Sequence, residues 1–401
     1  MRKTASFLVK ISGWGICALL FPFAASLFIF SVIHVAAAIA FFLFLLLVFP
    51  RLVKRKIPLL SAVLLTEILM IALLVYVYTS DRRPRECGFP LDRRVVPILT
   101  WSGCIRMAPG SVERNECLQV VENPYDLALY GGKLYVVSGR DDSTLGELDP
   151  VSPGGFQAYG LGFGNIQQIV PDPGTGMAVL PMWKDRKIVL LDLKNKKPVK
   201  IFRTDVGKLI GARRSGDRVF VISELAKMFV VDLETLSMKR RDLGYRFHTL
   251  YDIEVDETRN AIFLSDWVWG RVYRLDAGTL ETVAQRPVGI VATGLALDEK
   301  TCELFTSRPL ASEIVVLDCE TLERKRSIPA GFGVHEIALS GDGKKIHAVR
   351  YTPGTFRTMD REKGTVIREV RIGGQARALL VDWENNRVFA ATKCGIYRVS
   401  P

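Results

Sequence analysis

Two short runs decide the fold: Asn260-Ala261-Ile262-Phe263-Leu264-Ser265 and, after a loop, Arg271-Val272-Tyr273-Arg274-Leu275-Asp276. Both are rich in the β-branched and aromatic residues that favour strands, and the second ends in an aspartate. A degenerate copy of the second run stands at the end of the chain, as Gly395-Ile396-Tyr397-Arg398-Val399. An aspartate ends the same kind of run at six places, 40 to 44 residues apart: Asp149, Asp192, Asp232, Asp276, Asp318 and Asp360. A period near 40 built from short strands is typical of a β-propeller.

Each repeat is predicted to be one blade of four antiparallel strands, named a to d from the central channel outward. Strand b follows a turn rich in glycine, asparagine or aspartate, such as Gly131-Gly132, which hairpins require. The aspartate that ends strand c is expected to accept backbone N–H groups just beyond it in an Asx-turn. The middle of strand b forms a column that should pack between neighbouring sheets: Tyr135, Ala178, Phe220, Phe263, Phe305, His347 and Phe389.

The repeats therefore predict an all-β, seven-bladed propeller over residues 117–401. The last copy stops at Pro401, directly after its strand c, so it lacks a strand d. The run 117–121 reads as a strand that belongs to no repeat, and it is expected to close the last blade and leave no unpaired edge. Residues 81–116 carry several arginines, prolines and cysteines, and they are predicted to be a juxtamembrane linker.

The first 80 residues differ sharply from the rest, because Glu67 is their single acidic residue and residues 11–49 contain no Lys, Arg, Asp or Glu. A bilayer core takes about 20 helical residues. The segment is therefore predicted to be an α-helical membrane anchor of three spans, at about 11–30, 33–50 and 57–80, with two spans as the alternative. Glu67 lies inside the third span. It is either a functional intramembrane residue or a protonated glutamate that is hydrogen-bonded inside a small helical bundle or at a subunit contact.

Basic residues next to the spans give the orientation. With three spans, seven Lys and Arg residues flank the side of the N-terminus and five flank the propeller side, which predicts an extracytoplasmic (periplasmic or extracellular) propeller. Two spans give eight against four and a cytoplasmic propeller. Two possible disulfides, Cys302–Cys319 and Cys104–Cys117, favour the oxidising side, although ordinary buried thiols are the alternative. The formal net charge of +12 forms no basic stripe, so nucleic acid is not an expected partner.

In its strand pattern and blade length, the segment 117–401 resembles the YVTN-type seven-bladed propellers and their relatives, the NHL-repeat and gluconolactonase-like families. The YVTN group implies binding or surface roles. The gluconolactonase-like families imply a metal held in the channel by Glu, Asn and Asp, but their Asn ligands have no match in this chain. The Gly-His and Trp-Asp signatures of WD40 repeats are absent.

A propeller places the starts of its a strands and its b–c loops on one face. Aromatic and basic side chains at these positions are predicted to form a ligand-binding face: Tyr125, Trp183, Tyr251, Trp267, Trp269, Arg308 and Tyr351. Three acids, Asp126, Asp252 and Glu336, would ring its centre. They would suit calcium, unless they simply line a water-filled channel. His335 is a candidate general base.

The preferred function is therefore a membrane-anchored, extracytoplasmic propeller that binds a small ligand or a protein partner through its aromatic face. The alternative is a calcium-dependent, lactonase-like hydrolase that uses the three acids and His335. No nucleophile is specified by its spacing, so binding without catalysis is preferred. No cofactor other than calcium is expected.

Overall fold

The structure is a computed structural model that describes residues 95–100, 124–138, 144–151, 156–244 and 249–399. All of these belong to one compact unit, Arg85–Pro401. Within these ranges the structure has no helix that could span a bilayer. The predicted spans 11–30, 33–50 and 57–80, the intramembrane Glu67, the possible Cys104–Cys117 pair and the run 117–121 lie outside the described residues.

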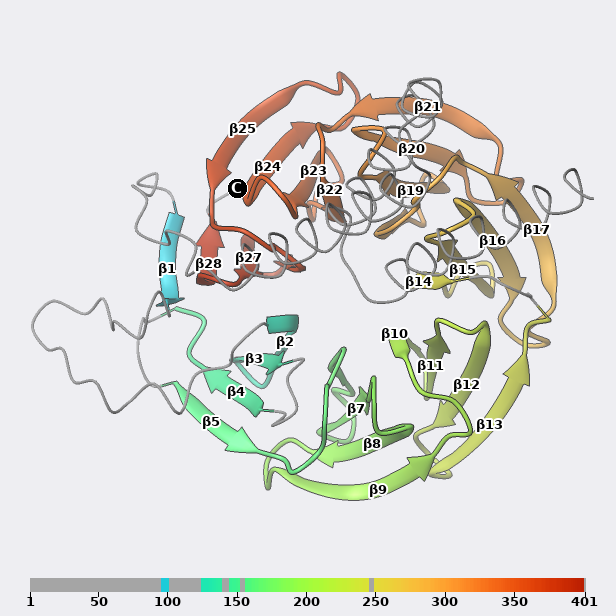
Figure 1. Cartoon of the computed structure of the whole chain (residues 1–401), viewed down its shortest axis with the longest axis vertical. Coiled ribbons are helices and arrows are strands. Elements are labelled where there is room, and N and C mark those ends of the chain that lie inside the picture. The colour runs from blue at the N-terminus through green and yellow to red at the C-terminus, as the bar shows by residue number, and fades with distance from the viewer. Residues whose placement is uncertain (1–94, 101–123, 139–143, 152–155, 245–248, 400–401) are drawn as a thin grey trace, which may run out of the picture. The chain divides into compact units, whose positions relative to one another are not determined.

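The described residues form seven four-stranded antiparallel sheets, arranged as blades around a centre (Figure 1). Blades 1 to 3 consist of β2 (Pro124–Tyr130), β3 (Lys133–Ser138), β4 (Thr144–Leu148) and β5 (Gln157–Gly160); β6 (Val170–Pro171), β7 (Met177–Pro181), β8 (Lys187–Asp192) and β9 (Lys197–Arg203); and β10 (Leu209–Ser215), β11 (Arg218–Ser223), β12 (Lys227–Asp232) and β13 (Ser237–Asp242).

Blades 4 to 6 repeat the same order of strands. They consist of β14 (Leu250–Asp256), β15 (Ala261–Asp266), β16 (Arg271–Asp276) and β17 (Thr282–Pro287); β18 (Leu295–Asp298), β19 (Glu303–Arg308), β20 (Glu313–Asp318) and β21 (Arg324–Pro329); and β22 (Val334–Leu339), β23 (Lys345–Arg350), β24 (Thr355–Asp360) and β25 (Val366–Arg371). The all-β propeller with seven blades is thus the fold that the 40-residue period predicts.

Blade 7 is completed by a strand from the start of the described region. It contains β26 (Ala378–Asp382), β27 (Arg387–Thr392) and β28 (Gly395–Val399), and β1 (Val95–Thr100) pairs antiparallel with β28 (Figure 1). The prediction that the run 117–121 closes the ring was therefore wrong: the closing strand lies about twenty residues earlier. Its sequence contains Pro97, and an outer strand is the place in a blade where a proline is tolerated.

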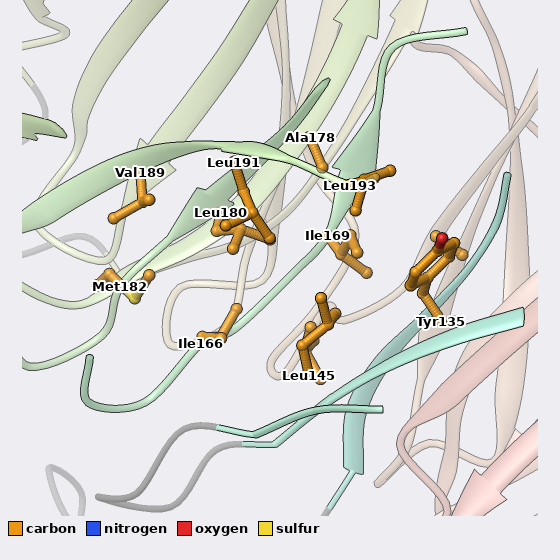
Figure 2. Packing of buried hydrophobic residues seen from close by; sticks show 12 residues of the cluster. Tyr135, Leu145, Ile166, Ile169, Ala178, Leu180, Met182, Val189, Leu191 and Leu193 are labelled. Carbon is orange, nitrogen blue, oxygen red and sulfur yellow. The ribbon is translucent and has the colours of Figure 1, made fainter. Parts of the chain in front are cut away.

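The core lies between neighbouring blades, in the layers that the aromatic column fills. All seven members of that column are buried, with Phe263 and Phe305 at 0 % exposure. Figure 2 shows one such layer, where Tyr135 and Leu145 of blade 1 face Ile169 and Leu191 of blade 2. The hydrophobic clusters of the described residues therefore lie between neighbouring blades, where each blade packs its side chains on the next.

The repeated aspartates form the turns that lead from the third strand of a blade to its outer strand, as predicted. Asp276 Oδ1 accepts the N–H groups of Gly278 and Thr279, at 2.9 and 2.7 Å. Asp318 does the same for Glu320 and Thr321, and these bonds lower its pKa to about 2. These aspartates are structural, because their carboxylates are occupied by their own turns.

His347 and the cysteines of blade 5 take structural places. The His347 ring is buried in the column, lies 3.2 Å from the Thr358 hydroxyl through Nδ1 and stacks on Phe356. Burial lowers its pKa to about 4, so the ring is neutral near pH 7. A disulfide joins Cys302, which directly precedes β19, to Cys319, which directly follows β20.

Candidate functional site

One face of the propeller carries loops from successive blades, and we call this the top face. Among the described residues it consists of the loops between the second and third strands of blades 2 to 7 and the links that enter the first strand of the next blade. Backbone hydrogen bonds join these segments in turn. The Lys208 N–H donates to the Trp183 carbonyl at 2.6 Å, and the Tyr351 N–H donates to the Gly333 carbonyl at 2.8 Å. Loops from different repeats therefore share one surface, as the propeller prediction requires.

Four of the predicted ligand-binding residues lie on the loops of the top face. Trp183 lies under the Lys208 ammonium, which is 5.7 Å from its ring centroid. The Arg308 guanidinium bonds to Glu313 within its own hairpin. Trp267 and Trp269 share the β15–β16 loop, in which the Trp269 N–H donates to Asp266 Oδ1 at 2.9 Å and the side chain points outward with 55 % exposure.

The other three predicted residues gather at the centre, in a group that we call the channel mouth: Tyr125, Tyr251, His335, Glu336, Tyr351 and Arg377. The Tyr251 hydroxyl lies 2.7 Å from His335 Nε2, and the two rings meet edge to face. The Tyr351 ring lies on the other side of His335, with ring centroids 5.4 Å apart. The imidazole is thus held between two tyrosines that come from blade 4 and from the loop of blade 6.

Arg377 joins the first and last blades at this mouth. Its guanidinium carbon lies 4.6 Å from the Tyr125 ring centroid and 5.3 Å from that of Tyr351, within the range of cation–π contacts. Its Nη2 donates to the Tyr351 hydroxyl at 2.8 Å. Ring closure brings Tyr125 of blade 1 and Arg377 of blade 7 together, although 252 positions separate them in the sequence.

Two of the three predicted metal ligands connect blades to each other. Asp126 Oδ2 accepts the Ile169 N–H of blade 2 at 3.0 Å, and Asp252 Oδ2 accepts the Leu295 N–H of blade 5 at 2.8 Å. Gln168 does the same for the Ala212 N–H of blade 3. Each side chain therefore ties an inner strand to its neighbour, which is a structural role that the repeat pattern did not reveal.

Arg213 neutralises part of this acidic centre. Its Nε and Nη2 donate to Glu254 Oε1 at 3.2 and 3.1 Å, and Nη2 lies 3.8 Å from Asp252 Oδ1. Burial disfavours its charge, but Glu254 and Asp252 outweigh burial and raise its pKa. The guanidinium is thus a fixed cation beside the inner strands of blades 3 and 4.

The two blade-connecting acids are poorly solvated, and this changes their ionisation. Burial raises the pKa of Asp126 to about 6, against the opposing effects of the Ile169 N–H and Arg213. Burial also raises the pKa of Asp252 to about 7; Arg213 opposes this change, whereas Glu336 and Glu254 add to it. The centre therefore disfavours additional negative charge.

The acids do not assemble into a metal site in the structure as described. No group of three or more His, Cys, Asp and Glu side chains in the described ranges is arranged to hold a metal ion. Asp126 and Asp252 direct carboxylate oxygens at backbone N–H groups, and Glu336 Oε1 lies 3.3 Å from His335 Nδ1. Calcium binding by these three residues remains a prediction without a supporting geometry.

The raised pKa of Asp252 predicts a pH-dependent stability. An acid whose pKa is higher in the folded state than in the unfolded state takes up a proton on folding, so stability is lost as pH rises through the folded value. Between pH 8 and pH 6 the free energy of unfolding should rise by about 1 kcal/mol more in the wild type than in Asp252→Asn. Urea unfolding at the two pH values measures this difference.

His347 changes the stability in the opposite direction. Because its pKa is lowered in the folded state, the free energy of unfolding falls as the pH drops below the unfolded pKa of the imidazole. Both proteins contain it, so the comparison between wild type and Asp252→Asn removes its contribution. Equal pH dependence in the two proteins would contradict the assignment of a raised pKa to Asp252.

Sequence reasoning missed Arg213 and Arg377, and a signal for Arg377 was present. Three of the predicted site residues directly precede the channel acids Asp126, Asp252 and Glu336 on inner strands: Tyr125, Tyr251 and His335. Arg377 directly precedes Ala378, the first residue of the inner strand of blade 7. Comparing this position in the seventh repeat with the same position in the other repeats would have identified Arg377. Arg213 lies in blade 3, where the inner-strand run Leu209-Ile210-Gly211-Ala212 matches the other repeats only weakly, so its register was not evident from the sequence.

Comparisons with known proteins support the fold but do not show a function. The β-propeller domain of Cps50 (Swd1) from Myceliophteria thermophila is similar with a TM-score of 0.59 and 17 % identity, over 70 % of this chain and 96 % of that domain. The WD40 β-propeller domain of Doa1 is similar with a TM-score of 0.58 and 15 % identity, over 69 % of this chain and 92 % of that domain.

No family model and no curated protein matches the chain. The propeller thus has WD40-like structural neighbours, although the WD40 sequence signatures are absent. The resemblance to the YVTN-type, NHL-repeat and gluconolactonase-like families stays a prediction.

Proposed function

We propose that this chain is a membrane-anchored, extracytoplasmic binding module whose top face docks a protein partner. The observation that carries the proposal is a set of four large apolar side chains exposed on that face, which we call the apolar arc. It consists of Leu225, Trp269, Ile290 and Phe332, which are 50, 55, 57 and 41 % exposed.

The apolar arc lies on neighbouring segments of the top face. Leu225 is in the β11–β12 loop, where the Leu250 N–H reaches the Glu224 carbonyl of that loop at 3.4 Å. The β15–β16 loop with Trp269 bonds the link that carries Ile290, because the Val288 N–H donates to the Gly270 carbonyl at 2.8 Å. The arc thus runs over the adjoining edges of blades 3 to 6.

A single exposed leucine needs no explanation in a soluble domain, but several large apolar side chains on one face indicate an interaction surface. Tryptophan and phenylalanine are among the residue types enriched in protein interfaces, and arginine is enriched there as well. Arg271 borders the β15–β16 loop that carries Trp269, and Arg350 Nε donates to the Phe332 carbonyl at 3.0 Å. A protein fits this spread of anchors over four blades better than a small molecule does.

Removing two anchors should release the partner. Full-length protein isolated from its native membranes with a covalent cross-linker is expected to carry a protein at a constant ratio, and Trp269→Ser with Phe332→Ser should reduce that ratio at least about tenfold. Quantitative mass spectrometry of the cross-linked product measures the ratio. The matched control is Trp383→Ser, because Trp383 is 68 % exposed in the β26–β27 turn at the opposite end of the blades.

The proposal fails if the double variant retains the partner as the wild type does. It also fails if the control variant loses the partner to the same extent, because binding would then not depend on the top face.

The disulfides support the extracytoplasmic placement of the propeller. Cys302 is bonded to Cys319, and Cys394 is also disulfide-bonded. Protein disulfides persist mainly in oxidising compartments. We expect peptide mapping of protein from membranes quenched with an alkylating reagent to recover Cys302 linked to Cys319. Recovery of both as alkylated free thiols would contradict this location and favour the cytoplasmic alternative, for which two membrane spans suffice.

A further inference from the structure

The channel mouth holds two charges that the fold does not neutralise locally. In the described part of the chain no carboxylate pairs with Arg377, whose polar contact is the neutral Tyr351 hydroxyl. On the same ring of side chains, Glu336 has a quarter of its side chain exposed and lies near the edge of His335. Arg377 contacts the neighbouring blades through the neutral side chains of Tyr125 and Tyr351, and Glu336 accepts no N–H group of a neighbouring blade in the described residues.

Glu336 differs from Asp126 and Asp252, the other two acids predicted at the centre, in its hydrogen bonding. Asp126 and Asp252 accept an N–H group of the next blade, whereas no neighbouring blade's N–H bonds to Glu336 in the described residues. Its oxygen atoms lie over Gly294, where an added Cβ would be 3.2 Å from Glu336 Oε2 and 2.6 Å from the His335 carbonyl. A glycine at that place leaves room beside the carboxylate.

The walls between the two charges are fixed. The His335 carbonyl accepts hydrogen bonds from the Gly294 N–H at 3.2 Å and from the Ser307 hydroxyl, which anchors this part of β22 on blade 5. His335 Nδ1 is buried and makes no well-aligned hydrogen bond, and the atom that faces it is Glu336 Oε1 at 3.3 Å. The imidazole is in turn held by Tyr251 and Tyr351, and the latter bonds Arg377. The cation and the anion are thus connected by one chain of packed rings.

The charges of the centre determine which ligand can enter. A purely anionic ligand would be drawn to Arg377 but repelled by Asp126, Asp252 and Glu336. A purely cationic ligand would be drawn to Glu336 but would meet Arg377 and Arg213. A ligand with both charges adds no net charge to a poorly solvated site and pairs each of the two spare groups.

We propose that the channel mouth binds a small zwitterion, such as a free amino acid, with its carboxylate on Arg377 and its ammonium on Glu336. The tyrosine rings at positions 125, 251 and 351 form the apolar wall against the carbon chain of the ligand. This site is separate from the apolar arc, so it stands or falls independently of protein docking.

The test uses full-length protein and a panel of ligands with matched charges. Glycine, leucine and γ-aminobutyrate carry both charges at different separations; N-acetyl-leucine carries only the carboxylate, and leucinamide only the amine. Affinities are measured by calorimetry with the wild type, Arg377→Gln and Glu336→Gln. The surface changes Arg203→Gln and Glu384→Gln are the controls, and thermal unfolding checks that every variant is folded.

We expect at least one zwitterion to bind and each single-charge analogue to bind at least about tenfold more weakly. Arg377→Gln should weaken the zwitterion and N-acetyl-leucine but not leucinamide, whereas Glu336→Gln should weaken the zwitterion and leucinamide but not N-acetyl-leucine. If Arg377→Gln does not fold, the Glu336→Gln arm alone decides. The proposal is overturned if no zwitterion binds, or if binding is the same in a folded channel-mouth variant and its surface control.

Discussion

Replacing Val95–Thr100 with glycine and serine in the full chain is expected to lower the free energy of unfolding of the propeller by about 3 to 5 kcal/mol. The segment pairs with β28 at five positions, from Val95 opposite Val399 to Thr100 opposite Gly395. Glycine and serine keep the backbone N–H and C=O groups, but glycine is costly to order in a strand, so β1 is expected to detach from β28. Each ladder hydrogen bond that is then lost contributes about 1 kcal/mol net. A loss of this size is a large part of the roughly 5 to 15 kcal/mol that stabilises a domain.

The loss has a second cause, because β28 would become an unpaired edge. Its residues Ile396, Tyr397 and Val399 are buried and pack with blades 6 and 1. In addition, Arg398 donates to the carbonyl groups of Pro150 and Val151 at 3.3 and 3.1 Å, and thereby connects blade 7 to blade 1. Opening the blade would weaken these contacts, and the exposed edge would favour aggregation.

The matched control replaces residues 118–121 with glycine and serine. This run was the closing strand expected from the sequence, and its replacement should cost less than about 1 kcal/mol if β1 closes the ring. Urea unfolding followed by tryptophan fluorescence measures both. A larger loss from the control than from the Val95–Thr100 replacement would contradict the observed closure.

Arg361→Met is the second substitution with a large expected effect, a loss of about 3 to 5 kcal/mol in the free energy of unfolding. Arg361 is buried in blade 6 and reaches across to blade 5. Its Nη1 donates to Asp298 Oδ2 at 2.6 Å, and its Nη2 donates to Glu303 Oε2 at 2.8 Å. Its guanidinium also lies 5.2 Å from the Phe305 ring centroid.

The cost arises because the carboxylates remain behind. Burial disfavours the ionised form of Glu303, but bonds from Arg326 and Arg361 outweigh it and lower its pKa. Asp298 depends on Arg361 in the same way. Without the guanidinium these acids stay largely buried with too few partners, and leaving a buried charge unpaired costs much more than losing an exposed pair.

Arg240→Met is the control for this effect. Arg240 pairs with Asp205 at 2.6 Å, but both side chains are nearly half exposed. The loss there should be below about 1 kcal/mol, as for other surface ion pairs. Equal losses in the two variants, measured by urea unfolding at neutral pH, would show that the Arg361 cluster is not a buried connection between blades.

The repeat made the fold predictable, because it fixes the order of strands inside each blade. The predicted run Arg271 to Asp276 is the observed β16, and the column through Phe263 is buried as expected. These features follow from local patterns: alternating apolar residues, and an aspartate that begins each turn. They need no knowledge of contacts between distant residues.

The closing strand was misplaced because it does not look like the others. Val95–Thr100 contains Pro97 and follows an arginine pair, so it reads as part of a linker. The run 117–121 was chosen because it stood next to the first repeat, and closeness in sequence does not decide which segment completes a ring. Prolines at the same kind of outer position, Pro198, Pro287 and Pro329, were the available hint.

The site was partly predictable for the same reason. Tyr125, Tyr251, His335 and Tyr351 were found, since they stand at fixed places in the repeats. The structural use of Asp126 and Asp252 was not found, because it depends on the distance between neighbouring blades rather than on either repeat alone. Arg377 contacts Tyr125 only because ring closure places blade 7 beside blade 1. The channel mouth therefore depends on the closed ring.

The most direct test of this account is a cross-link between β1 and β28. Val96 lies opposite Arg398, and facing residues of antiparallel strands have Cα atoms about 4.5 to 5.5 Å apart, which suits a disulfide. The double variant Val96→Cys with Arg398→Cys is oxidised and its peptides are mapped by mass spectrometry. We predict a disulfide that links the peptide containing position 96 to the peptide containing position 398. The pair Val96→Cys with Arg241→Cys on β13 should not link. Absence of the first link, or equal yields of both, would contradict a ring that is closed by residues 95–100.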